Sequence, residues 1–123
     1  MIGIDLFCGA GGMTLGATQA GIDVGFAINH WHPAIMSHKE NHPDCKHWCA
    51  KLSEVDPHTD PKVPRKDVFI LFGGPSCTHH SSARGGAPIN DQMRTHPFEM
   101  LTWVDACRPT WIVVENVPEF RNW

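Results

Sequence analysis

Short apolar runs alternate along this chain with segments of helical periodicity. The apolar runs predict five strands, at residues 2–7, 23–28, 46–50, 68–72 and 111–114. The helical segments are 11–21, 33–40 and 97–107. Strands and helices that alternate in this way predict a doubly wound α/β fold, with a mostly parallel sheet and helices on both faces.

The same pattern predicts which faces are buried. The unbroken runs at 68–72 and 111–114 are typical of strands that are covered on both faces. The apolar helix positions expected to face the sheet are Met13, Ala17, Ala20, Phe98, Met100, Leu101 and Val104. Trp103 is interpreted as a packing residue too. The segments 56–66, with three prolines, and 73–95, with little periodicity, predict loops.

Composition narrows the class of protein. A length of 123 residues allows one small domain, and 41% hydrophobic with 19% charged residues excludes a disordered chain. No apolar run reaches the roughly 18 residues of a membrane span, and the first residues do not resemble a signal peptide. The net charge of −3 gives no indication of nucleic-acid binding.

The five cysteines are odd in number and irregularly spaced. They predict free thiols in a reducing compartment. We therefore expect a cytoplasmic protein that is not secreted, encoded by a bacterium, an archaeon or a phage, with no membrane partner.

Ligands of doubly wound sheets bind where the strands end, so the residues after each predicted strand carry the candidate chemistry. The first segment is Asp5-Leu6-Phe7-Cys8-Gly9-Ala10-Gly11-Gly12. Its glycines let the backbone turn sharply and approach a ligand. The spacing differs from G-x-G-x-x-G, so the dinucleotide fingerprint is absent. A plain strand-to-helix turn is the alternative.

The second segment is Gly73-Gly74-Pro75-Ser76-Cys77-Thr78. A cysteine directly after a buried strand is held at the ligand edge, and its thiolate is a candidate nucleophile with Arg84 as a neighbour. An inert cysteine in a turn is the alternative.

The third segment is Glu115-Asn116-Val117. A carboxyl group at the end of a buried strand is poorly solvated, so its pKa should rise and it should donate a proton near neutral pH. An exposed glutamate at the start of a loop is the alternative.

Together, the three segments resemble the C5-cytosine DNA methyltransferase family in order and spacing, over essentially the whole chain. Asn29-His30-Trp31 and Asn41-His42-Pro43 also resemble the second-strand region of that family. The resemblance implies a Rossmann-like domain that binds S-adenosylmethionine and methylates C5 of a cytosine flipped out of duplex DNA. DNA binding and a role in restriction-modification follow as expectations.

The resemblance also implies residue roles. Cys77 matches the nucleophile that attacks cytosine C6, and Glu115 matches the acid that engages N3. The residues implied for S-adenosylmethionine are Phe7, Gly9, Ala10, Gly11, Gly12, His30 and Trp31, with the Trp31 ring on the adenine. Those expected to bind the substrate are Ser81, Arg84, Asn116 and Val117.

Three positions depart from the family pattern. The usual Pro-Cys-Gln is Ser76-Cys77-Thr78 here, which changes the stiffness of the loop and one cofactor contact. His30 stands where many members have an acidic residue that binds the ribose. Lys51 stands near a common aspartate and cannot accept a hydrogen bond from the adenine amino group.

Members of the family are much longer than this chain. We interpret residues 1–123 as a partial catalytic domain, truncated after the fifth strand, without the target-recognition domain and the C-terminal motifs. We expect it to be inactive without that half, which a second chain could supply. The alternatives are a non-catalytic or partner-dependent cofactor-binding module and an RNA cytosine methyltransferase.

His38, His42, Cys45, His47 and Cys49 lie within twelve positions. Their side chains are of the kind that zinc prefers, but their spacing matches no common structural zinc pattern, so no metal site is predicted. A metal-binding module stays as a non-enzymatic alternative. His79 and His80 are interpreted as solvated loop residues, with a phosphate contact as the alternative.

Overall fold

The computed structural model describes residues 1–75 and 96–118. In chain order the elements are β1 (Ile2–Leu6), α1 (Gly12–Gln19), β2 (Val24–Asn29), α2 (His32–Asn41), β3 (Lys46–Cys49), the short 3-10 turn η1 (Leu52–Glu54), β4 (Val68–Gly73), α3 (His96–Cys107) and β5 (Trp111–Val114). All five predicted strands and all three predicted helices are confirmed, with ends that differ by one or two residues.

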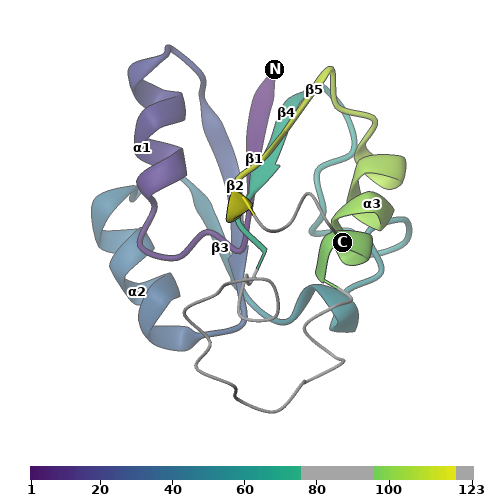
Figure 1. Ribbon diagram of the computed structural model, residues 1–123, viewed down its shortest axis with the longest axis horizontal. Helices are drawn as coiled ribbons and strands as arrows, with labels where there is room; N and C mark the ends of the chain where they lie inside the picture. The colour runs from purple at the N-terminus through teal and green to yellow at the C-terminus, as the bar shows by residue number, and fades with distance from the viewer. Residues whose placement is uncertain (76–95, 119–123) are drawn as a thin grey trace.

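The strands form one sheet in the order β3-β2-β1-β4-β5, and each pair is parallel. Helices α1 and α2 lie on one side of the sheet and α3 lies on the other (Figure 1). The predicted doubly wound α/β fold is therefore confirmed. The strand order reverses between β1 and β4, and a crevice at the carboxyl ends of such a pair is the usual place for a ligand.

Two apolar clusters hold the helices to the sheet. The cluster on the α3 side centres on Trp103, which is 1% exposed, and includes Met100 and Cys107 from the same helix. The cluster on the other side includes Ala27 and Phe72 from the sheet and Ile35 from α2. Because both faces of the central strands are covered, the long apolar run of β4 is mostly buried, as predicted.

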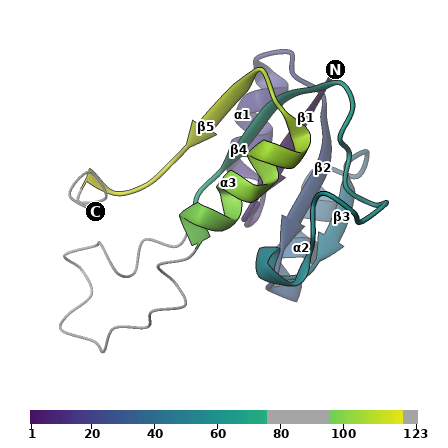
Figure 2. The same ribbon diagram turned by 90° about the vertical axis from the view of Figure 1, so that its right-hand side faces the viewer.

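The predicted burial of β5 is wrong. All four of its residues are exposed, by 45% to 60% of their surface. Within the described residues, β5 pairs with β4 on one side only and forms the border of the sheet opposite β3 (Figure 2). An apolar run shows that a strand is suited to burial, but the tertiary structure decides whether other elements cover that strand.

The inward faces of two helices also differ from the prediction. Phe98 and Leu101 are more than half exposed, because α3 turns Met100, Trp103 and Cys107 toward the sheet instead. Apolar residues three and four positions apart occur on two faces of this helix, one with Phe98 and Leu101 and one with Met100, Trp103 and Cys107. The second face, which carries the large side chain of Trp103, is the buried one. Ala20 is exposed because α1 ends one residue before it.

Four of the cysteines lie in the described residues, and all four are free thiols, as predicted: Cys8, Cys45, Cys49 and Cys107. Of the helices in the described ranges, none has the length and apolar character needed to cross a membrane.

Candidate functional site

The glycine-rich loop leaves β1 with an unusual backbone. Phe7, Gly9 and Gly11 all have positive φ, at 60°, 53° and 97°. At Gly11 a side chain is excluded for a second reason, because an added Cβ would lie 2.5 Å from the ring of His42. Phe7 carries a side chain, so its positive φ is a strained backbone conformation. The Phe7 ring packs on the ring of His96, with 5.2 Å between the two centroids. Such strain is typical of functional loops.

Helix α2 fixes the loop from outside. The side-chain amide of Asn41 donates a hydrogen bond to the carbonyl oxygen of Ala10, at 3.0 Å. Nε2 of His42 donates to the carbonyl oxygen of Gly11, also at 3.0 Å. The end of α2 therefore sets the position of the loop that precedes α1.

A buried polar network lies under the loop. Asp5, 1% exposed, accepts a hydrogen bond of 2.6 Å from the hydroxyl group of Thr14. Nε2 of His38, which is fully buried, lies 3.1 Å from the same hydroxyl and 3.8 Å from Oδ2 of Asp5. Nδ1 of His38 lies 2.8 Å from Nε2 of His47. This network joins β1, α1, α2 and β3 directly below the candidate site.

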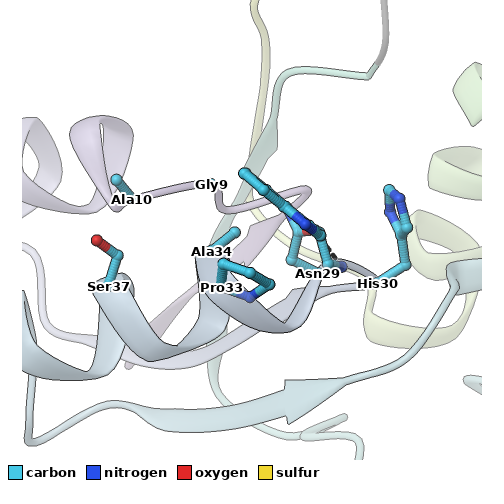
Figure 3. A pocket seen from close by; sticks show the side chains of 8 residues that line it. Gly9, Ala10, Asn29, His30, Pro33, Ala34 and Ser37 are labelled. Atoms are coloured by element: carbon cyan, nitrogen blue, oxygen red, sulfur yellow. Dashed lines mark hydrogen bonds between the residues drawn. The ribbon is translucent and has the colours of Figure 1, made fainter.

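A cavity of about 460 Å³ opens between the loop and the start of α2. Figure 3 shows Gly9 and Ala10 of the loop on one side, Pro33, Ala34 and Ser37 of α2 on another, and Asn29 and His30 at the end of β2. Trp31 completes the lining. The volume lies in the range of roughly 300–1,000 Å³ that small-molecule sites occupy.

The end of β2 presents an aromatic ring to this cavity. Oδ1 of Asn29 accepts a hydrogen bond of 2.9 Å from the backbone N–H of Trp31, which fixes the turn. The Trp31 side chain is 62% exposed, so its ring is free to stack on a ligand. His30 lines the cavity, whereas Lys51 pairs with Glu54 at 3.7 Å and is not among the lining residues.

The second and third sequence motifs come together at the neighbouring strand ends. The backbone N–H of Glu115 donates to the carbonyl oxygen of Gly73, at 3.1 Å. The side chain of Asn116 donates to the carbonyl oxygen of Pro75, at 3.2 Å, and accepts from the backbone N–H of Val117, at 2.8 Å. The turn after β5 is thereby tied to the segment that leads into Ser76 and Cys77.

The carboxyl group of Glu115 lies against this segment, since a Cβ built at Gly74 would be 3.0 Å from its Oε2. Its predicted poor solvation is wrong, because Glu115 is exposed at the end of the exposed strand β5. The predicted residues Cys77, Ser81 and Arg84 lie outside the described residues, as do His79 and His80.

Two of the described thiols, Cys8 and Cys45, are buried below the glycine-rich loop, and burial disfavours their thiolate forms while no cation is bound. Burial, with the nearby carboxylate of Asp5 as a smaller cause, raises the pKa of Cys8 far above that of a free thiol. Burial raises the pKa of Cys45 to about 12. Neither has the character of a reactive nucleophile.

Sequence reasoning missed several residues of the site. Pro33, Ala34 and Ser37 line the cavity, and Thr14 and His38 hold Asp5 from below. The signal that could have found them is the chain order, because the helix after the second strand of such a sheet begins at the ligand edge. Thr14 was also a polar residue next to the predicted inward position Met13.

Comparisons with known proteins agree with this arrangement. The C-5 cytosine-specific DNA methylase family model matches residues 1–123. Type II methyltransferase M.AgeI of Thalassovita gelatinovora is 36% identical over 118 residues, which are 93% of this chain and 27% of that protein. Type II methyltransferase M.HgiGI of Herpetosiphon aurantiacus is 34% identical, over 96% of this chain and 91% of that protein.

A similar fold is found in the crystal structure of Spodoptera frugiperda DNMT2, with a TM-score of 0.72 and 22% identity. The match covers 100% of this chain and 38% of that one. Compared with the two methyltransferases above, this chain spans about a quarter of the length of M.AgeI and nearly all of the length of M.HgiGI. With the family model matched from end to end, the chain belongs to the C-5 cytosine-specific DNA methylase family.

Proposed function

We propose that this chain forms the cofactor-binding and catalytic part of a DNA (cytosine-5)-methyltransferase that uses S-adenosylmethionine. One observation carries the proposal. The cavity at the end of β2 and the Glu115–Asn116 turn after β5 lie at the same carboxyl edge of the sheet, on the two sides of the β1–β4 switch. A methyl donor and a base held at these two places would face each other.

The cavity suits the cofactor in its size and lining. Bound there, S-adenosylmethionine would supply an electrophilic methyl group. The exposed ring of Trp31 would stack on the adenine, and a neutral ring nitrogen of His30 would accept a hydrogen bond from a ribose hydroxyl. Phe7, Gly9, Ala10, Gly11 and Gly12 would bring the backbone close to the methionine part.

The chemistry requires a nucleophile and an acid at the base. C5 of cytosine is a weak nucleophile, because it is part of an aromatic ring. The Cys77 thiolate adds to C6 while Glu115 gives a proton to N3, so that C5 becomes an enamine carbon and takes the methyl group. Loss of the C5 proton to water then re-forms the C5–C6 double bond and breaks the C6–S bond, so that Cys77 leaves as the thiolate and the proton on N3 returns to Glu115.

The substrate in this proposal is duplex DNA with one flipped cytosine. Ser81, Arg84, Asn116 and Val117 are the proposed contacts to it. The hydrogen bond from Asn116 to Pro75 supports the assignment, since Pro75 lies two residues before Cys77. A cytoplasmic role in restriction-modification, with a second chain supplying the target-recognition part, belongs to the same proposal.

The cofactor half of the proposal is tested by calorimetric titration with S-adenosylmethionine. Trp31→Ala should weaken binding about 10-fold, because it removes the stacking surface. Trp111→Ala is the matched control, since Trp111 is a tryptophan of similar exposure, 60%, on β5. Equal affinities of the two variants would contradict the assignment of Trp31.

The catalytic half is tested with duplex DNA that contains 5-fluorocytosine. Fluorine cannot leave C5 as a proton does, so the Cys77 adduct should persist and appear in the mass spectrum. Where this chain by itself is inactive, the segment that follows in the longer relatives is supplied as a second chain. Cys77→Ser should abolish the adduct and Cys49→Ser should not. An adduct only with tRNA would favour an RNA substrate.

A further inference from the structure

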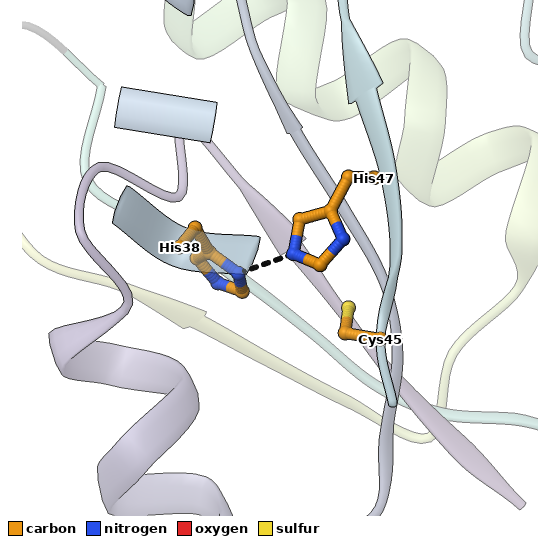
Figure 4. A group of neighbouring side chains, drawn as sticks. All are labelled: His38, Cys45 and His47. Carbon is orange, nitrogen blue, oxygen red and sulfur yellow. Dashed lines mark hydrogen bonds between the residues drawn. The ribbon is translucent and has the colours of Figure 1, made fainter. Parts of the chain in front are cut away.

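Three metal-binding side chains gather below the glycine-rich loop, apart from the proposed cofactor cavity. They are His38 of α2, Cys45 in the turn that follows α2, and His47 of β3. Their ligand atoms all lie within 4.8 Å of one another (Figure 4). In the sequence these three residues stand among five histidines and cysteines within twelve positions, and the fold separates them. His42 donates to the carbonyl oxygen of Gly11 and Cys49 lies by that of His30, whereas Cys45, which lies 3.5 Å from the carbonyl oxygen of Lys46, is within reach of both His38 and His47.

Hydrogen-bond counting assigns the ring proton of His38. The hydroxyl group of Thr14 has one proton, which it donates to Asp5 at 2.6 Å. Its oxygen must then accept from Nε2 of His38 at 3.1 Å, so Nε2 carries the proton. The neutral ring therefore has its lone pair on Nδ1, which faces Nε2 of His47 at 2.8 Å.

The surroundings of His38 are those of a metal ligand. Histidines that bind metals commonly give their other N–H to a carboxylate or a second polar group, which orients the ring. Here Thr14 and Asp5 occupy that side, with Oδ2 of Asp5 3.8 Å from Nε2. His38 is fully buried, so these contacts fix the orientation of its ring.

The donor set selects the kind of ion. Two imidazoles and one thiol suit zinc and exclude calcium and magnesium, which take oxygen ligands. Cys45 is 7% exposed, whereas His47 is half-buried, so the cluster has a side from which an ion and a water molecule can approach. Ligands at about 2.0–2.3 Å from zinc lie roughly 3.3–3.8 Å apart, so the two ring nitrogens, now 2.8 Å apart, must separate when an ion binds.

We propose that Nδ1 of His38, Sγ of Cys45 and Nε2 of His47 bind one zinc ion, with a water molecule as the fourth ligand. The thiol proton is released to solvent when the thiolate binds, and the proton that His47 donates to Nδ1 of His38 from its Nε2 moves to Nδ1 of the His47 ring. The ion would join α2 to β3 and thereby stiffen the helix whose end holds the glycine-rich loop. The inference does not depend on the proposed methyltransferase activity.

The test uses the whole chain, stripped of metal with a chelator and titrated with zinc alone against a chromophoric competitor. We expect one zinc per chain, which elemental analysis after dialysis should also find. Cys45→Ser and His47→Gln should each weaken zinc binding at least ~100-fold. Loss of a residue that only hydrogen-bonds to a metal ligand weakens binding by up to about 100-fold, and each of these variants loses a ligand itself. Cys49→Ser is the matched control, because this exposed neighbour points elsewhere, and it should bind zinc like the unchanged chain.

Cobalt(II) gives a second readout of the same site. A thiolate-to-cobalt charge-transfer band should appear in the unchanged chain and in Cys49→Ser, and be absent from Cys45→Ser. Circular dichroism checks that each variant is folded. If Cys45→Ser does not fold, His47→Gln, altered at a half-buried position, carries the test. Absence of stoichiometric zinc at micromolar concentration, or zinc affinity unchanged in a folded Cys45→Ser or His47→Gln variant, would overturn the proposal.

Discussion

At the scale of single residues, the most informative side chain is Asp5. It begins the glycine-rich motif, yet it points away from the cavity into the protein, where Thr14 donates to it and His38 lies beside it. A buried carboxylate is costly unless it is hydrogen-bonded. Asp5 therefore acts on the site indirectly, by anchoring the strand end from which the loop departs.

Replacement of Thr14 should show how much this anchor contributes. Thr14→Val keeps the shape of the side chain but leaves Asp5 and His38 without the hydroxyl group that joins them. We expect a loss of about 2 kcal/mol in the free energy of unfolding, measured by urea denaturation. Thr14→Ser, which keeps the hydroxyl and loses one methyl group, should lose about 1 kcal/mol. A Thr14→Val variant at least as stable as Thr14→Ser would contradict this account.

At the scale of secondary structure, α2 does more than cover the sheet. Its first turn lines the cavity with Pro33 and Ala34, and its last residue, Asn41, holds the loop on the opposite wall. One helix thus sets the distance between two walls of the same cavity. Asn41 shares this task with His42, which donates to Gly11, and with the backbone bond from Cys8 to Ile28.

Asn41→Ala should therefore weaken cofactor binding while the fold stays intact. Loss of the hydrogen bond to Ala10 is worth about 1 kcal/mol, which corresponds to roughly 5-fold in affinity for S-adenosylmethionine. Glu40→Ala, a change at the adjacent exposed position of the same helix, serves as the control. Calorimetric titration of both variants measures the difference, and equal affinities would argue against a role of Asn41 in positioning the loop.

At the scale of the whole molecule, the sheet that the described residues form has one well-covered half and one open border. Trp111 to Val114 of β5 are exposed, and Phe98 and Leu101 of the adjacent α3 are exposed too. An apolar strand at an open edge favours pairing with a further strand. We expect the isolated chain to be marginally stable and to self-associate through this border.

A single charge on the border should reduce that association. Val113→Lys places an ammonium group on the open strand, where it opposes edge-to-edge pairing. Sedimentation velocity over a range of protein concentrations should show a larger monomer fraction for this variant. Gln19→Lys adds a lysine at the exposed end of α1 and should behave like the unchanged chain. The idea fails if both variants associate equally or if the unchanged chain is a concentration-independent monomer.

The sequence by itself determined the order and type of the elements and the motifs at the strand ends. Local patterns are sufficient for this, because an apolar run such as that of β4 favours a buried strand, and the glycines after β1 can adopt the positive φ angles that a sharp turn requires. The parallel sheet followed from the alternation of strands and helices. Gly9, Ala10, His30 and Trp31, which the family resemblance assigns to the cofactor, all line the cavity, and their role in cofactor binding stays a prediction.

Only the tertiary structure decided which of these residues meet, and which faces are covered. The exposure of β5 and of Phe98 depends on what packs against them, and a periodic pattern carries no information about the neighbour. His38, Cys45 and His47 come together because α2 runs back along the sheet and β3 pairs with β2, which sets atoms from three elements at one point. Such a meeting depends on distances in space, and spacing along the chain does not encode it.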